Sequence, residues 1–325
     1  MKGFWGQILD AFIIFSLAGS IVTSLGEGVL QVASGLDSQF GVPSTRVSWG
    51  IISLLMIAIY TASSCAGIKR GMRFISDING KLFFVFLGFV FIVGPTIFNI
   101  NLGLEALANY IESFFSRHLF LAPISGDSFP RIWTLFFFAI WYAWAPVTGM
   151  FLARMAYGRT VRQFAVMNLL LPSAFGMVWF TLFGGTAIHM EVVQNLGIAK
   201  ILSEKGVEAA MFAFLNFLPL AKITVPAFFV VIVLSFCTTA DAMTSTVAMM
   251  CTTSDAMKGE EEAPVMLKLG WGVVMGLIAW IVITFAKIDG LRAIVSLAAA
   301  PAALVVVLQA IASYRMLKND ASVKR

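Results

Sequence analysis

Charged side chains are scarce in this 325-residue chain, making up 12% of it, against roughly 25% in a typical soluble domain. Hydrophobic residues make up 59%. This small number of charges cannot give a folded domain a polar surface. The composition therefore excludes a soluble globular protein. It predicts instead an all-α membrane protein, a bundle of helices that crosses the bilayer several times.

Residues and motifs that carry enzyme chemistry are also rare. The 3 cysteines lie far apart, with neither the spacing of a metal site nor that of a disulfide framework. The 2 histidines, His118 and His189, fall in connecting segments. The chain contains no HExxH, GxSxG or phosphate-loop motif and no pair of carboxylates at catalytic spacing. We therefore expect no enzyme, no organic cofactor and no nucleic-acid partner.

Long apolar segments account for most of the chain. A helix that crosses a bilayer needs about 20 apolar residues. Eight segments approach that length, at about 8–33, 48–66, 82–99, 133–153, 164–187, 225–250, 269–286 and 292–312. We expect one transmembrane domain over residues 1–325. Residues 102–120 form an amphipathic pattern, which predicts a helix in the membrane interface or a strut between two bundles.

Lysine and arginine are divided unequally between the two sets of connections. An even number of spans places both termini on one side, and connections rich in Lys and Arg face the cytoplasm. The set that includes the termini holds fourteen of the 22 Lys and Arg residues, and the other set holds eight, mostly in longer connections. The sequence therefore predicts a multi-pass protein of the plasma membrane with both termini in the cytoplasm.

The apolar segment that begins at Trp133 carries aromatic residues at its middle. Trp141, Tyr142 and Trp144 fall near the midplane, whereas aromatic residues usually gather at the membrane–water interfaces. Two residues three apart lie about 60° apart around a helix, so the two tryptophans are expected to present adjacent rings beside a bend at Pro146. Such rings suit a quaternary ammonium group, which has no hydrogen-bond donor. Ordinary lipid-facing or core tryptophans are the alternative.

Hydroxyl groups and an acid cluster in the segment 225–250. Ser235 and Thr239 share a helix face, and Thr238 lies beside them. Such hydroxyls commonly donate to carbonyls of the preceding helical turn. Alternatively, they are hard oxygen ligands for a small cation such as sodium, completed by another helix. Asp241, an acid at membrane depth, favours the functional interpretation.

A second acid, Glu27, lies in the first apolar segment. It could extend toward the interface, pair with Gln31 one turn away, or act as a proton site. The serines and glycines of the same segment have a simpler interpretation, because small residues let helices pack closely.

Several stretches resemble, in order, the signature sequences of the betaine/carnitine/choline transporter family. Residues 133–164 (WTLFFFAIWYAWAPVTGMFLARMAYGRTVRQF) are similar to the family's tryptophan-box helix. Residues 67–79 (GIKRGMRFISDIN) resemble the cytoplasmic turn before the family's GPT helix, and VGPT at 93–96 resembles that helix's end. SLGEGVLQVASGL at 24–36 and TTADAMTS at 238–245 resemble two further family helices. Several motifs in the family's order indicate this family more specifically than any single motif would.

The resemblance implies a twelve-span transporter whose last ten helices form two inverted repeats of five, the LeuT-like arrangement. The segments here match the fifth to twelfth helices of that pattern. We therefore expect a partial inverted-repeat core that lacks the N-terminal helices, among them a glycine-rich broken helix. Two explanations remain open: a fragment of a longer reading frame, or a truncated paralogue.

The resemblance also implies a function. It is secondary active transport of a quaternary-ammonium or related osmolyte of the betaine, carnitine or choline type, coupled to an ion such as sodium. Trp141 and Trp144 match the second and third tryptophans of the family's substrate box, and Ile140 replaces the first. Thr238 and Thr239 match a hydroxyl pair that resembles a sodium site. The expected partners are a small-molecule substrate, membrane lipid and, by resemblance, two further copies in a homotrimer.

Two other hypotheses remain open beside this one. The first is a truncated membrane paralogue that does not transport. The second is a transporter of other small zwitterions or organic cations on the same scaffold.

Overall fold

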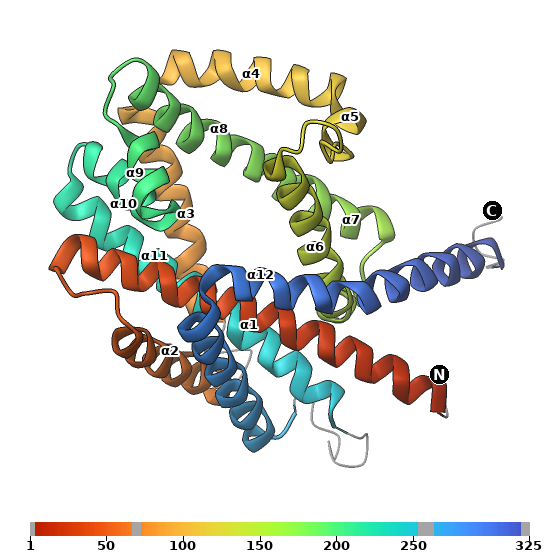
Figure 1. Ribbon diagram of the computed structural model, residues 1–325. Coiled ribbons are helices and arrows are strands. Elements are labelled where there is room, and N and C mark those ends of the chain that lie inside the picture. The colour runs from red at the N-terminus through yellow and green to blue at the C-terminus, as the bar shows by residue number, and fades with distance from the viewer. Residues whose placement is uncertain (1–3, 67–72, 253–262, 320–325) are drawn as a thin grey trace.

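The computed structural model describes residues 4–66, 73–252 and 263–319, and every regular element in these ranges is helical. The α-helices are α1 (Phe4–Phe40), α2 (Arg46–Ala66), α3 (Arg73–Val93), α4 (Thr96–Glu112), α5 (Phe114–His118), α6 (Ser128–Met155), α7 (Val161–Ala165), α8 (Leu171–Val192), α9 (Ile198–Lys205), α10 (Val207–Phe217), α11 (Ala221–Met250) and α12 (Val265–Asn319). A π-helical turn, η2 (Val166–Leu170), joins α7 to α8. Figure 1 shows α1 crossing the molecule, with α2, α11 and α12 around it.

Six helical stretches of the described chain are long and apolar enough to cross a membrane: Gly6–Phe40, Arg46–Ser63, Arg73–Val93, Val161–Val192, Ala221–Met250 and Val265–Met316. The last of these contains both predicted spans 269–286 and 292–312. Its helix, α12, breaks between them at Lys287, whose φ of 52° and ψ of −148° are not helical. The predicted span 133–153 lies in α6, a helix of 28 residues that is not among the six. The division into eight spans therefore stays a prediction.

The predicted span 82–99 crosses a helix break. Pro95 lies between α3 and α4 and has no N–H to donate to the carbonyl of Phe91. The Thr96 hydroxyl donates to that carbonyl instead, at 2.6 Å. The chain changes direction here, and α4 extends along α8, away from α1 (Figure 1).

The segment predicted as an interfacial helix, 102–120, is divided between two helices. α4 already begins at the Pro95 break, and Ser113 separates it from α5. Exposed apolar residues recur along α4 at helical spacing, among them Ile97, Leu104 and Ile111. The position of this helix in the membrane interface stays a prediction.

Small residues and hydroxyl groups hold α1 against α12, as the sequence predicts for the first apolar segment. A side chain at Gly19 would place its Cβ 2.7 Å from the Cβ of Ala298. The Ser16 hydroxyl donates to the carbonyl of Ala298 at 2.7 Å, and the Thr23 hydroxyl donates to that of Leu291 at 3.0 Å. Close approach and hydroxyl-to-carbonyl bonds between helices are typical of membrane bundles.

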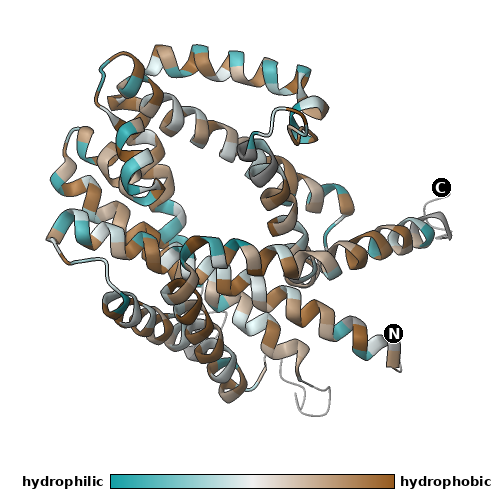
Figure 2. Ribbon diagram, in the orientation of Figure 1, coloured by the Kyte–Doolittle hydropathy of each residue, from teal (hydrophilic) through white to brown (hydrophobic). Residues whose placement is uncertain are grey.

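Apolar side chains also cover surfaces that face away from the core. α2 exposes Ile51, Leu54 and Leu55, and Figure 2 shows hydrophobic residues over most of α2 and α12. An exposed apolar surface of this kind suits helices that face lipid. The connections 67–72 and 253–262, which include Lys69, Arg70 and Lys258, lie outside the described residues. The orientation of the termini stays a prediction.

Candidate substrate site

The two tryptophans of α6 face different surroundings. Trp144 is half-buried and packs against the main hydrophobic core. Trp141 is 69% exposed and lines a cavity of about 450 Å³ with Arg117, His118 and Trp133. The structure therefore does not bring these rings together, although they lie on neighbouring faces of one helix.

The residues between the two tryptophans explain this divergence. Ala143 is buried, and it packs against Val295 and Ala299 of α12. Tyr142 packs against the same group and stacks on Phe138, with ring centroids 6.3 Å apart. This contact with α12 fixes the rotation of α6 about its axis. Tyr142, predicted as a substrate ligand, belongs to this helix contact and does not line a cavity with Trp144.

Trp144 closes a small cavity between α6, α1 and α11. Ser24 and Ile21 line it from α1, and Phe236 and Thr239 line it from α11. Space for the centre of a water molecule amounts to about 10 Å³, which is roughly the room that one water needs. The structure thus brings one predicted substrate residue and one predicted cation ligand to the same point.

The predicted cation ligands of α11 use their hydroxyl protons within the bundle. Thr238 donates to the carbonyl of Leu234 at 2.7 Å, and Thr239 donates to that of Ser235 at 2.9 Å. Ser235 also bonds the side chain of Asn79 on α3, at 3.0 Å and 3.3 Å. These bonds match the simpler interpretation of hydroxyls in a membrane helix.

A sodium ion would fit this hydroxyl set only in part. A hydroxyl oxygen that donates its proton keeps lone pairs for a cation, so Thr238 and Thr239 could each supply one ligand. The carbonyls around them belong to a continuous helix, and Thr239 alone of the three predicted ligands lines the Trp144 cavity. Within the described residues, no group of three or more His, Cys, Asp or Glu side chains could hold a metal ion.

Both predicted functional acids lie outside the Trp144 cavity. Asp241 is 1% exposed, and its Oδ2 accepts a hydrogen bond of 2.6 Å from the Ser63 hydroxyl of α2. Glu27 is half-buried on α1, where Arg292 and Glu208 act on it electrostatically. Neither acid therefore lines the cavity where Trp144 and Thr239 meet.

Sequence reasoning missed two residues of this region. Phe236 lines the cavity and lies against Gly28, where a Cβ would come within 2.6 Å of the ring. Asn79 pairs with Ser235 across two helices. The glycines in the first apolar segment indicated that other side chains pack closely against this helix, but they did not identify Phe236 as one of them.

The helices, their apolar spans and the tryptophan-lined cavity define a multi-pass membrane protein with its candidate site inside a helical bundle. A sequence model of a protein family, described as "BCCT, betaine/carnitine/choline family transporter", matches residues 1–322. The chain therefore belongs to this family, as its motifs predicted. It is a member of a transporter family and not of an enzyme family.

Several relatives of the chain are named as transporters of ectoine, glycine betaine, proline or choline. The chain is 30% identical over 316 residues to the ectoine/hydroxyectoine transporter of Virgibacillus pantothenticus. It is 26% identical over 317 residues to the glycine betaine transporter OpuD of Bacillus subtilis. It is 32% identical over 282 residues to a glycine betaine/proline/choline transporter of Vibrio parahaemolyticus.

The chain spans only part of each of these relatives. The matches cover 97%, 97% and 85% of the chain, but 62%, 60% and 48% of the respective relatives. The chain thus spans between about half and three-fifths of the length of these relatives.

Proposed function

We propose that this chain takes part in secondary active transport of a small osmolyte with a methylated ammonium or related head group, of the betaine, ectoine or choline type. The observation that carries the proposal is the cavity of Trp144, in a chain that belongs to the betaine/carnitine/choline transporter family. The substrate names of the relatives support the same class of solute.

The chemistry of the cavity suits such a solute. Trp144 and Phe236 supply two aromatic rings, and none of the described residues that line the cavity is charged. A methylated ammonium group cannot donate a hydrogen bond, so ring faces and apolar contact are what a protein can offer it. Ser24 and Thr239 could bond the polar end of a zwitterion.

The cavity must widen to admit a solute. It has room for about one water molecule, whereas cavities that hold small ligands measure about 300–1,000 Å³. Its walls belong to three different helices, so a relative movement of α6 against α1 and α11 would open it. We propose that this structure corresponds to a closed stage of a transport cycle.

Several further parts of the proposal rest on the family resemblance. They are a partial inverted-repeat core, coupling to sodium through Thr238 and Thr239, two cytoplasmic termini in the plasma membrane, and a homotrimer. In this proposal the hydroxyl oxygens of Thr238 and Thr239 on α11 would be two of the sodium ligands, and other helices would complete the ligand set.

A titration with glycine betaine tests the proposal. The purified chain is placed in lipid nanodiscs, and binding is followed by calorimetry. Trp144→Leu removes the ring and should weaken binding about tenfold or more, whereas Trp144→Phe keeps a ring and should weaken it less. Trp179→Leu is the matched control, because Trp179 stacks on Phe183 of its own helix, at 4.1 Å, and does not line the cavity. Unchanged binding by Trp144→Leu would refute the proposal.

A further inference from the structure

The cavity of about 450 Å³ that Trp141 lines lies between α5 and α6. Its described walls are two residues of α5, Arg117 and His118, and one face of α6 that includes Trp133, Phe137 and Trp141. None of these residues lines the Trp144 cavity. The two cavities are therefore separate, and each can bind a solute of its own kind.

The aromatic residues of α6 form a stripe along this cavity. Trp133, Phe137 and Trp141 are each four residues apart, so they share one face of the helix, over about 12 Å of its axis. The rings of Trp133 and Phe137 stack, with centroids 5.4 Å apart. Phe137 is 49% exposed and Trp141 is 69% exposed. The cavity therefore offers an elongated apolar wall that the rest of the described chain leaves largely uncovered.

The charged residues of the cavity lie at the beginning of this stripe. The hydroxyl of Thr134, in the second turn of α6, donates to the carbonyl of Phe120 at 3.2 Å. This bond places the end of α5 beside the first turns of α6, as Figure 1 shows. The Nδ1 atom of His118 is bonded to the carbonyl of Phe114 at 2.6 Å, which fixes the ring there. A cationic end thus carries Arg117, and the apolar rings lead away from it along α6.

The guanidinium group of Arg117 is free to meet a ligand. The residue is exposed, and neither an ion pair nor a hydrogen bond joins its side chain to another described residue. Asp127 and Glu112, the acids nearest to it in the sequence, do not line the cavity. Arg292, which also lies near the stripe, is instead paired with Asp289 at 3.6 Å. Arg117 therefore gives the described walls of the cavity a positive charge that no acidic wall residue balances.

From this arrangement we propose that the cavity binds an amphiphile with one hydrocarbon tail and a carboxylate head group, that is, a fatty-acid anion. Arg117 would hold the carboxylate with two parallel hydrogen bonds. The tail would lie along Trp133, Phe137 and Trp141, where contact with the rings removes apolar surface from water. The volume of about 450 Å³ lies within the range of small-ligand cavities.

Other solutes match the cavity less well. A quaternary ammonium would suit the rings, but the charge of Arg117 repels it. A short zwitterion such as glycine betaine would leave most of the stripe uncovered. An uncharged amphiphile would leave Arg117 without a partner. The stripe is a single row of rings, which suits one tail better than the two tails of a phospholipid.

Sodium octanoate is the probe for the test. The whole chain is placed in nanodiscs of the zwitterionic lipid phosphatidylcholine and titrated at pH 7, where a carboxylate is ionised. Heat is measured by calorimetry and compared with that of empty nanodiscs. We expect octanoate to bind saturably, and 1-octanol and octylammonium to bind at least about tenfold more weakly. Equal binding of either one, or no octanoate binding beyond that of empty nanodiscs, would overturn the proposal.

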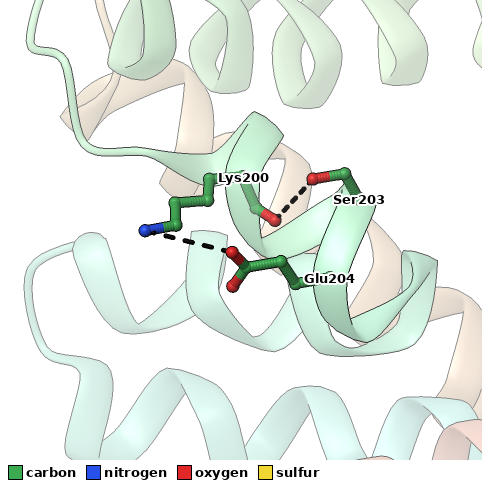
Figure 3. Close-up of polar contacts among 3 residues, drawn as sticks. All are labelled: Lys200, Ser203 and Glu204. Atoms are coloured by element: carbon green, nitrogen blue, oxygen red, sulfur yellow. Dashed lines mark hydrogen bonds and ion pairs between the residues drawn. The ribbon is translucent and has the colours of Figure 1, made fainter.

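A charge substitution at Arg117 tests the head-group contact. Arg117→Gln should weaken octanoate binding about tenfold or more, because it removes the charge and the paired donors. Lys200→Gln is the matched control: the exposed ammonium of Lys200 on α9 lies 3.9 Å from the Glu204 carboxylate (Figure 3) and does not line the cavity. It removes the same charge and should leave the affinity unchanged. Equal losses in the two variants would mean a general attraction of anions and would contradict a site at Arg117.

The length of the tail tests the apolar stripe. Each methylene group that the rings cover should tighten binding several-fold, so the affinity should rise from butanoate to octanoate. Trp141→Ala removes the end of the stripe farthest from Arg117, and the exposure of Trp141 makes the change compatible with folding. It should weaken octanoate binding by roughly fivefold or more and leave butanoate binding unchanged. An equal effect on both carboxylates would contradict a tail that lies along α6.

Two further comparisons separate this proposal from its alternatives. It rests on the α5–α6 cavity and not on the proposed transport function, so Trp144→Leu should leave octanoate binding unchanged, and glycine betaine should not displace octanoate. Displacement by glycine betaine would contradict a fatty-acid site. Nanodiscs that also contain phosphatidylglycerol test a two-tailed anionic lipid as the occupant. Octanoate should still bind there; if phosphatidylglycerol abolished its binding, the fatty-acid assignment would be wrong.

Discussion

Two cavities of this molecule are built from different parts of helices. The Trp144 cavity is enclosed by continuous stretches of α1, α6 and α11, and it has space of about 10 Å³ for the centre of a water. Another cavity, of about 340 Å³, lies where α3, α8 and α10 end and where α4 and α11 begin. Carbonyls in the middle of a helix are bonded to the next turn, whereas those at its carboxyl end are not.

This difference decides what each cavity can recognise. Inside continuous helices, the side chains must supply all recognition, so Trp144, Phe236 and Thr239 are the groups that a solute meets first. Where helices end and others begin, the backbone itself supplies both acceptors and donors. A solute without hydrogen-bond donors suits the first cavity, because its aromatic rings and apolar walls ask for none.

The largest expected effect comes from placing a side chain at Gly28, which lies against the Phe236 ring that lines the Trp144 cavity. A Cβ at Gly28 would lie 2.6 Å from the Phe236 ring. Gly28→Val should therefore displace that ring and lower stability by about 1–3 kcal/mol through overpacking. Glycine betaine binding should fall with it. Thermal unfolding and the titration with glycine betaine measure these effects.

The matched control for this change is Gly88→Val on α3. A Cβ at Gly88 would meet nothing within 4 Å, so stability and the affinity for glycine betaine should stay near those of the unchanged chain. If both glycine variants lowered stability equally, the close contact at Phe236 would not explain the effect.

A smaller effect is expected from the buried acid of α11. Asp241→Ala removes the acceptor of the Ser63 hydroxyl, and the loss of such a buried bond costs about 1–3 kcal/mol. Because Asp241 does not line the Trp144 cavity, the affinity for glycine betaine should change little.

A double-mutant cycle with Ser63→Ala checks the pairing between these two residues. Residues in direct contact show a coupling of about 0.5–3 kcal/mol in the free energy of unfolding. Additive losses would contradict a direct bond, and a large loss of betaine binding would assign Asp241 to the site after all.

Much of the fold and part of the site could be predicted from the sequence. Scarce charge and long apolar segments predicted an all-helical membrane protein, and the ordered motifs predicted the family correctly. Trp144 and Thr239 each match a family motif, but the sequence did not predict that they line one cavity. Helix breaks were harder to predict: the hydrogen bond from Thr96 at the Pro95 break, and the non-helical backbone of Lys287, depend on local geometry that apolar length does not report.

The cavity at the helix ends could not be predicted at all, for a physical reason. It exists because three helices end and two begin at the same place, and helix breaks of this kind depend on local geometry. His189 was noted in the sequence only as part of a connecting segment. The structure places it on α8 with its ring against Phe98 of α4 and its Nδ1 atom buried, and hydrophobic periodicity does not report such packing.

The smallest effect separates the two tryptophans of α6. The sequence predicted adjacent rings from a spacing of three residues, but Ala143 packs into α12 and leaves Trp141 69% exposed. Trp141→Leu should therefore change the affinity for glycine betaine by less than about twofold in this chain, because an exposed ring that lines another cavity gives the solute little cation–π attraction. Calorimetry beside Trp144→Leu measures the difference.

Because the rotation of α6 separates the two rings, either outcome of the comparison between Trp141→Leu and Trp144→Leu gives information about the bound state. If Trp141→Leu weakened binding as much as Trp144→Leu, both rings would contact the solute in the bound state. Since Ala143 is fixed against Val295 and Ala299, that result would require α6 to turn relative to α12 when the solute binds. An unequal effect would instead mean that α6 keeps its present rotation, and that Trp144 alone of the two rings contacts the methylated head group.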